Sequence, residues 1–487
     1  MNPQSLLITL PEIEIAVFGL ITLLAAAFCG ARVTRHIGVL AIISFALAGF
    51  TLFCHLRLHF LLNGRLPVFA FGTQFVDDGF ARFVKAIILV ASSLSLLLSW
   101  SYFEKDGSER PEYPVLILFA TLGMMLMASA CDMLSLYVGL ELQSLALYVL
   151  AAFRRDDARS SEAGVKYFVL GALSSGILLY GISLLYGFAG TTDFASLSFA
   201  LRGQVQATPG IVVGMVFVCA ALAFKVSGAP FHMWTPDVYE GSPTPVTAFF
   251  ASAPKLAALA LFTRFVLEPM SGLTAQGHQA ILFISVASML WGAFAGVAQT
   301  DLKRLLAYSS IANVGYLLIG LLVGGKTGVQ AILIYFTIYA LGTLGAFAVI
   351  LCLRRGGKAA SSLADLSGLS RTHPLVSLAM SVLMFSLAGI PPLAGFFGKY
   401  FLFLAAVQTG WLPLAIIGVL SSVVTAYYYL RIVKVMYVDE SASPLDPLPD
   451  WGVRFVLGLS SLAVVGITLM PSPLVDEALR AARGFLG

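Results

Sequence analysis

Four ionisable side chains lie inside long apolar stretches of this 487-residue sequence: Glu141, Lys225, Lys255 and Lys399. A carboxylate and three amines can each take up and release a proton. Burial favours the neutral form of an amine, whereas a nearby carboxylate favours the ammonium. A change in the distance between Glu141 and Lys225 would therefore switch Lys225 between accepting and donating a proton.

The composition indicates that these stretches cross a membrane. Hydrophobic residues make up 59% of the chain and charged residues only 11%, against about 25% charged residues in soluble domains. A soluble fold could not cover so much apolar surface, and disordered chains are poor in apolar residues. What remains is a polytopic membrane protein. A charge at the bilayer centre costs at least about 2.5–3.5 kcal/mol, so we expect the four buried groups to transfer protons.

The sequence predicts an all-α membrane protein of about fourteen transmembrane helices. The expected spans are 12–30, 37–56, 80–101, 114–130, 133–153, 163–187, 209–240, 244–267, 278–298, 303–323, 328–353, 373–409, 411–437 and 452–470.

Two of these spans, 209–240 and 373–409, are too long for one crossing and contain helix breakers. Proline removes a backbone donor and clashes with the preceding turn, so each is expected to be a broken helix. Paired interruptions in two halves of a transporter typically mark an ion pathway. The breakers are Ser227, Gly228 and Pro230 in the first span, and Gly389, Pro391, Pro392 and Gly395 in the second.

Basic residues predict the orientation. The net charge is +4, and lysine and arginine gather after odd-numbered spans, as at Arg32, Arg35, Arg154 and Arg155. By the positive-inside rule these connections are cytoplasmic and both termini periplasmic. The second broken helix comes five spans after the first, so the second unit is expected to be inverted relative to the first.

Several other patterns have no expected chemical role. The segment 320–327 matches the phosphate-loop pattern GxxxxGK[ST], but it ends an apolar helix rather than following a strand. His55 and His59 have a metal-like spacing without an acidic or cysteine partner nearby, so we expect structural roles. The five cysteines form no CxxC pair, which gives no support for iron–sulfur or zinc ligation.

Three runs resemble the antiporter-like subunits of respiratory complex I, the bacterial NADH–quinone oxidoreductase. They are residues 224–246, which contain Lys225, residues 301–316, and residues 387–399, which end at Lys399. The run around Glu141 is similar to the family's fifth-helix motif. The chain's length, its lack of a long C-terminal amphipathic arm and its lysine at 399, where an M-type subunit is expected to carry glutamate, favour the N-type subunits.

The resemblance implies fourteen helices, with helices 4–8 and 9–13 as inverted repeats and helices 7 and 12 broken. The corresponding segments are 1–112, 113–272, 273–440 and 441–487, the second and third being the repeats. The resemblance also implies that Glu141, Lys225, Lys255 and Lys399 occupy the proton-path positions, with Lys166 a secondary candidate.

A relay from Lys225 to Lys255 and then to Lys399, through water held at the helix breaks, is our working hypothesis. Tyr308, Ser309 and Ser310 are candidates for holding that water. Lys225 precedes its breaker and Lys399 follows its own, so Lys399 is also a candidate for the exit to the outside.

The resemblance implies a proton-translocating subunit in a bacterial cytoplasmic membrane with no redox centre of its own. NADH, FMN, iron–sulfur clusters and quinone would be bound by other subunits. The expected partners are an M-type antiporter-like subunit and small K- and J-type subunits. Three alternatives stay open: a subunit of a multisubunit cation/proton antiporter, a passive scaffold, and a membrane subunit of a related hydrogenase.

Overall fold

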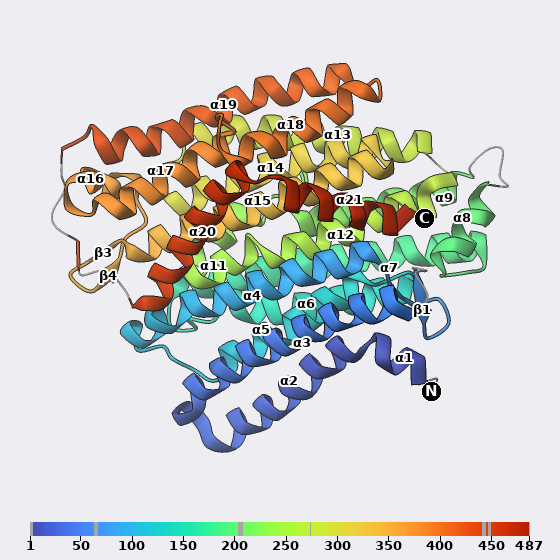
Figure 1. The fold of residues 1–487 in the computed structure, drawn as a ribbon, viewed down its shortest axis with the longest axis horizontal. Helices are drawn as coiled ribbons and strands as arrows, with labels where there is room; N and C mark the ends of the chain where they lie inside the picture. The colour runs from blue at the N-terminus through green and yellow to red at the C-terminus, as the bar shows by residue number, and fades with distance from the viewer. Residues whose placement is uncertain are drawn as a thin grey trace.

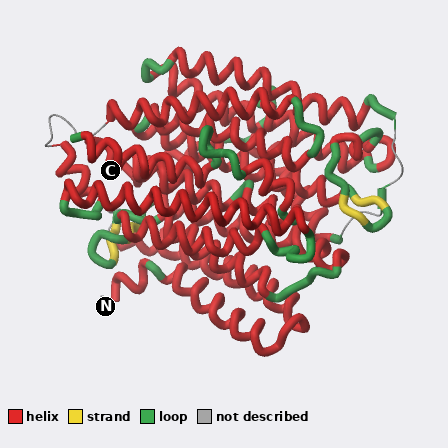
Figure 2. The backbone as a smooth tube through the Cα atoms, turned by 180° about the vertical axis from the view of Figure 1, so that it is seen from behind, coloured by secondary structure: helices red, strands yellow, loops and turns green. Residues whose placement is uncertain are grey.

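Helices that run side by side dominate the structure, and their connections gather at two ends (Figure 1, Figure 2). The computed structural model describes residues 3–62, 67–202, 208–272, 274–440, 445–446 and 450–486. Within these residues, 11 helical segments are long and apolar enough to cross a membrane, and further apolar helices are shorter. The expected all-α polytopic fold is confirmed.

Residues 3–106 form a group of helices with a small hairpin. Its elements are α1 (Pro3–Ile8), α2 (Leu10–Cys29), the short η1 (Gly30–Val33), α3 (Thr34–Leu62), β1 (Val68–Ala70), β2 (Phe75–Asp77) and α4 (Gly79–Asp106).

Two groups of helices follow. The first comprises α5 (Glu112–Ala128), α6 (Met133–Ala151), α7 (Ala158–Ala189), α8 (Phe194–Arg202), α9 (Pro209–Val226), α10 (Thr235–Gly241), α11 (Thr244–Phe250), α12 (Ala253–Leu267) and η2 (Pro269–Gly272). The second comprises α13 (Thr274–Val297), α14 (Leu302–Val323), α15 (Gly325–Cys352), β3 (Arg354–Arg355), β4 (Lys358–Ala359), η3 (Leu363–Leu366), α16 (Leu369–Thr372), α17 (Pro374–Ala388), α18 (Ala394–Gln408) and α19 (Leu412–Tyr437).

The chain closes with α20 (Trp451–Leu469) and α21 (Ser472–Leu486). Both chain ends lie at the same end of the bundle, at the right of Figure 1, together with β1 and α8. We call this the terminal end. The opposite end carries the α2–α3 turn and β3–β4, and we call it the basic end because Arg32 and Arg35 lie there.

Both predicted helix breaks are present. The span 209–240 divides into α9 and α10, because Ser227 ends α9 in a left-handed conformation with φ 67° and Pro230 follows. The span 373–409 divides into α17 and α18 at Gly389, whose φ of 82° suits a residue without a Cβ. Pro391 and Pro392 lie between the two halves. The two broken helices hold the same place in successive groups of five spans, which is the expected inverted arrangement.

The expected span 244–267 contains a third helix break, which the sequence did not predict. The segment divides into α11 and α12, with Ala251 and Ser252 between them. Pro254 stands in the first turn of α12, where its missing N–H costs nothing, although it would break a helix that continued through it. The third break therefore has the same cause as the other two.

The C-terminal segment also forms a helix that the sequence did not predict. Gln330, near the start of α15, donates a hydrogen bond from Nε2 to the carbonyl of Val475 in α21, at 3.1 Å. At the other end of α21, the ring of Phe485 lies 4.9 Å from that of Phe80 in α4. This helix therefore joins α15 to α4 at the terminal end of the bundle.

The structure locates the phosphate-loop-like segment and one residue of the His55/His59 pair, neither of which has an expected chemical role. Residues 320–327 form the end of α14, Gly324 and the start of α15, so no strand precedes them, as expected for a chance match. His55 lies in α3, whereas the side chain of His59 lies outside the described residues.

The start of α18 leaves no room for a larger residue at Gly395. Its amide donates to Ser386 Oγ at 3.1 Å, and an added Cβ would collide with the backbone carbonyl of Ser386. We expect Gly395→Ala to lower the free energy of unfolding by about 1–3 kcal/mol, the usual cost of overpacking, measured as a lower temperature for thermal dissociation of the purified assembly. Gly458→Ala is the matched control, because nothing lies within 4 Å of its added Cβ. Equal dissociation temperatures for the two variants would contradict this account of the break.

Candidate functional site

Glu141 and Lys225 approach each other through hydroxyl groups. Lys225, in the last turn of α9, is buried and donates from Nζ to Ser144 Oγ at 2.8 Å and to Tyr148 Oη at 3.2 Å. Glu141 accepts a hydrogen bond from Ser175 of α7. Glu141, Ser144 and Tyr148 follow one another along one face of α6, each about one turn after the one before. The structure thus places the carboxylate and the amine at one polar site without a direct ion pair.

Lys255 lies in the first turn of α12, directly after the third helix break. Its side chain is 1% exposed, and its amine donates to Ser310 of α14. Nζ also lies 5.0 Å from the ring centroid of Tyr239 in α10, a cation–π distance. Of the three hydroxyl residues proposed to hold water, Ser310 is the one that contacts the lysine.

The side chain of Lys399 reaches across the second helix break. It belongs to α18, yet Nζ donates to the carbonyl of Ala388, the last residue of α17, at 2.9 Å. A second hydrogen bond reaches Ser422 Oγ of α19 at 2.7 Å. The amine also lies 5.0 Å from the ring centroid of Tyr316. This lysine is therefore held by both halves of the broken helix and by a neighbouring helix.

A chain of buried polar groups occupies the region between Lys255 and Lys399. Ser309, next to the Ser310 that binds Lys255, shares a hydrogen bond with Tyr429 of α19. Asn313 donates to Tyr429 Oη at 3.3 Å and accepts from Tyr335 of α15. The serine and tyrosine hydroxyls rotate and can both donate and accept, and the Asn313 amide donates through its nitrogen and accepts through its oxygen, so these groups link one helix to the next by hydrogen bonds. Sequence reasoning identified Ser309 but missed Tyr429, Asn313 and Tyr335.

Lys225 and Lys255 are less directly connected. Among the residues that the structure describes, no hydrogen bond joins the Lys225 site to the Lys255 site. Aromatic rings fill the space near them: Trp234 stacks on Tyr167 at 4.3 Å and lies 6.5 Å from Tyr239. A proton that moves between these two lysines would need water or a rearrangement of these side chains.

The secondary candidate Lys166 belongs to a charged cleft at the basic end. Its Nζ lies 2.6 Å from Glu162 and 2.8 Å from Asp237 of α10. Arg304, in the first turn of α14, lies 2.8 Å from Asp237 and 2.9 Å from Glu240. The cleft they line has a volume of about 260 Å³. Lys166 thus lies apart from the fully buried lysines, in a place open to solvent.

A second group of buried charges lies at the terminal end and was not predicted. Lys85 of α4 lies 2.6 Å from Glu12 of α2, and both side chains are at most 4% exposed. Arg264 of α12 lies 2.9 Å from Asp78, which caps the start of α4. Each cation has a carboxylate partner, as charges buried in a membrane protein require.

In the described part of the chain, no three histidine, cysteine or acidic side chains come together in a way that could hold a metal ion. Among the cysteines, Cys131, Cys219 and Cys352 are buried free thiols, and Cys29 and Cys54 are exposed.

Comparison with known proteins now adds to this geometry. A family model described as "NADH:quinone oxidoreductase/Mrp antiporter, TM" matches residues 130–425. NADH-quinone oxidoreductase subunit N of Rhodospirillum rubrum is 51% identical over 99% of this chain and 98% of its own length. The protein of the same name from Paramagnetospirillum magneticum is 52% identical over 97% of this chain and 96% of its own length.

Solved structures show the same fold. A chain of respiratory complex I from Thermus thermophilus with bound aureothin is 34% identical, with a TM-score of 0.80 over 96% of this chain and 98% of that one. A chain of the Mrp complex from a Dietzia species has a TM-score of 0.84 over 100% of both chains, but at 23% identity this likeness concerns the fold alone. The resemblance seen in the sequence is confirmed: the chain belongs to the NADH:quinone oxidoreductase/Mrp antiporter transmembrane family, and within it to the N-type subunits.

Proposed function

We propose that this chain carries protons across a bacterial cytoplasmic membrane as a membrane-arm subunit of a proton-translocating NADH–quinone oxidoreductase. One observation carries the proposal: three buried lysines, Lys225, Lys255 and Lys399, each adjoin a helix break, and each donates to a hydroxyl group. A structural role alone would not require ionisable groups at all three interruptions, because small polar side chains satisfy freed backbone groups at lower cost.

The helix dipole favours a positive charge at two of the three lysines and disfavours it at the third. Lys225 lies at the C-terminal end of α9, and Lys399 reaches the C-terminal carbonyl of α17. Both positions stabilise a positive charge through the helix dipole, whereas Lys255 lies at the N-terminal end of α12, which opposes one. We therefore assign Lys225 and Lys399 as the residues that hold a proton and Lys255 as the one that passes it on.

The proposed path starts in the charged cleft of Lys166, Asp237 and Arg304 at the basic end, which we assign to the cytoplasm. It passes Lys225, paired functionally with Glu141, and continues through Lys255 and the Ser309–Tyr429–Asn313 chain to Lys399. Lys399 is the proposed exit toward the periplasm, where both termini would lie. Residues 113–272 and 273–440 are the two proposed functional repeats.

The partners are proposed from the surface around Glu141. Val138 and Leu145, one turn to either side of Glu141 on α6, are 58% and 57% exposed, and Phe168 and Leu173 of α7 are also exposed. An apolar face with a carboxylate at its centre suits a helical membrane subunit better than lipid. An M-type antiporter-like subunit and small K- and J-type subunits are the proposed neighbours, and NADH, FMN, iron–sulfur clusters and quinone would bind elsewhere in the complex.

A native gel of host membranes in mild detergent, stained for NADH dehydrogenase and analysed by mass spectrometry, tests the assignment. We expect this chain in the NADH-oxidising band, together with flavin and iron–sulfur subunits. Migration with small membrane subunits only, without NADH activity, would instead support the cation/proton antiporter. Sodium-dependent proton transport in vesicles would be the second sign of that alternative. If the chain belonged to a hydrogenase, it would migrate with hydrogenase subunits instead of NADH-oxidising ones.

A further inference from the structure

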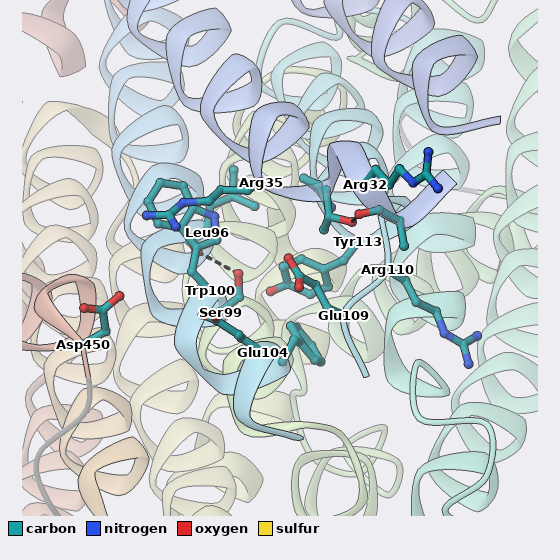
Figure 3. Close-up of a pocket in the computed structure, with 14 residues that line it drawn as sticks. Arg32, Arg35, Leu96, Ser99, Trp100, Glu104, Glu109, Arg110, Tyr113 and Asp450 are labelled. Carbon is teal, nitrogen blue, oxygen red and sulfur yellow. Dashed lines mark hydrogen bonds between the residues drawn. The ribbon is translucent and has the colours of Figure 1, made fainter. Parts of the chain in front are cut away.

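A cleft at the basic end lies outside the proton path. It is lined by the α2–α3 turn, the end of α4 and the start of α5 (Figure 3). Asp450, which directly precedes α20, also lines it. Its volume is about 260 Å³, slightly below the usual range for drug-sized ligands. This size suits a small polar group.

The cleft lies at the depth where a membrane meets water. It forms where α2 and α4 end and where α3 and α5 begin. Trp100 lines it and packs edge-on against Trp451 at 6.2 Å, and tryptophan is typical of the membrane interface. Beside it, α2 presents exposed apolar side chains, including Phe28 at 86% and Leu24 at 58% exposure. A lipid could therefore place its headgroup in the cleft and its acyl chains along α2.

The charges around the cleft are balanced, yet they do not neutralise one another directly. Three arginines and three acidic residues line the cleft, namely Arg32, Arg35, Arg110, Glu104, Glu109 and Asp450. Among the described residues, none of these arginines and neither glutamate forms an ion pair. Asp450 accepts a hydrogen bond from the amide of Trp451 at 2.8 Å.

We propose that this cleft binds the headgroup of phosphatidylethanolamine. Guanidinium groups match the oxygens of a phosphodiester, and the carboxylates match a primary ammonium, which has three hydrogens to donate. Phosphatidylglycerol and cardiolipin would satisfy the arginines and leave the carboxylates facing an anionic ligand. A choline headgroup has no N–H to donate to Glu104 or Glu109.

The test uses the intact complex in lipid nanodiscs that contain a photoactivatable phosphatidylethanolamine. After illumination, we expect cross-links to peptides that contain Trp100 or Tyr113. Arg35→Gln should lower this labelling about tenfold, the effect of losing one charge-assisted hydrogen bond, and Glu104→Gln should lower it as well. Arg155→Gln is the control, because Arg155 belongs to the same end of the bundle, is 72% exposed and lies outside the cleft.

Two comparisons distinguish the lipid from other ligands. Nanodiscs with photoactivatable phosphatidylglycerol, cardiolipin or phosphatidylcholine should label the cleft weakly, and stronger labelling by any of them would overturn the proposal. Excess inorganic phosphate should not displace the lipid, so displacement would show a simple phosphate site instead. If a variant failed to assemble, labelling of the wild-type complex in competition with unlabelled phosphatidylethanolamine would still decide, because an unchanged signal or no signal would contradict specific binding.

Discussion

Lys225→Met should abolish proton transfer through this chain while leaving the complex assembled. Methionine keeps the length and apolar stem of the lysine but removes the amine that donates to Ser144 and Tyr148. Removal of a group that carries a proton typically slows transfer by about a hundredfold or more. The measurement is NADH-driven acidification of proteoliposomes that contain the purified complex, normalised to NADH oxidised by an artificial acceptor at the peripheral arm.

Lys105→Met provides the control for Lys225→Met. Lys105 is an exposed lysine in the last turn of α4, so its loss should not change acidification. Normal assembly with lost acidification would exclude the passive scaffold, in which buried charges only fix helix packing. Wild-type acidification by the Lys225→Met complex would instead contradict the relay.

The positions of the lysines could be predicted because charged side chains are rare inside membrane-spanning helices. An amine inside a long apolar run has few structural explanations, and proline beside it marks a place where helical hydrogen bonds end. Lys225 and Lys399 combine both signals. Lys255 carries the second signal too, in Pro254, but the surrounding run has the length of one ordinary span, so only the structure shows the break.

The hydrogen-bond partners could not be predicted because they come from helices distant in the sequence. Lys255 meets Ser310 of α14, and Lys399 meets Ser422 of α19. Serine and tyrosine are common in membrane helices. Their spacing along the sequence does not show whether a given side chain contacts another helix or faces lipid. Which helices are neighbours depends on packing of small residues such as Gly292, where the backbone of α14 approaches α13 closely.

The charges at the terminal end escaped prediction for a different reason. Glu12, Lys85 and Arg264 lie near the ends of their spans, where charged side chains usually reach the interface or indicate topology. The structure instead buries all three, because Lys85 of α4 pairs with Glu12 of α2, and Asp78 at the start of α4 pairs with Arg264 of α12. Pairing across helices is therefore what distinguishes an interior charge from an interfacial one.

Arg264 connects several elements at that end. It binds Asp78, the N-cap of α4, and donates to the carbonyl of Ala128 at the end of α5 at 3.3 Å. Its guanidinium also lies 5.4 Å from the ring of Phe80 and 5.0 Å from that of Phe485 in α21. One side chain thus holds α4, α5, α12 and the C-terminal helix together.

Arg264→Met should therefore lower the stability of the assembled protein strongly. It leaves the carboxylate of Asp78 buried and without its cation, which typically costs about 3–5 kcal/mol. We expect a clear fall in the temperature of thermal dissociation and less complex on a native gel. Arg480→Met is the matched control, because the Arg480–Glu477 pair is exposed and such pairs contribute about 0–1 kcal/mol. The double variant Arg264→Met/Asp78→Asn should recover part of the loss, since asparagine still caps a helix without a buried charge. A single variant as stable as the control would mean that the guanidinium does not hold this end of the bundle together.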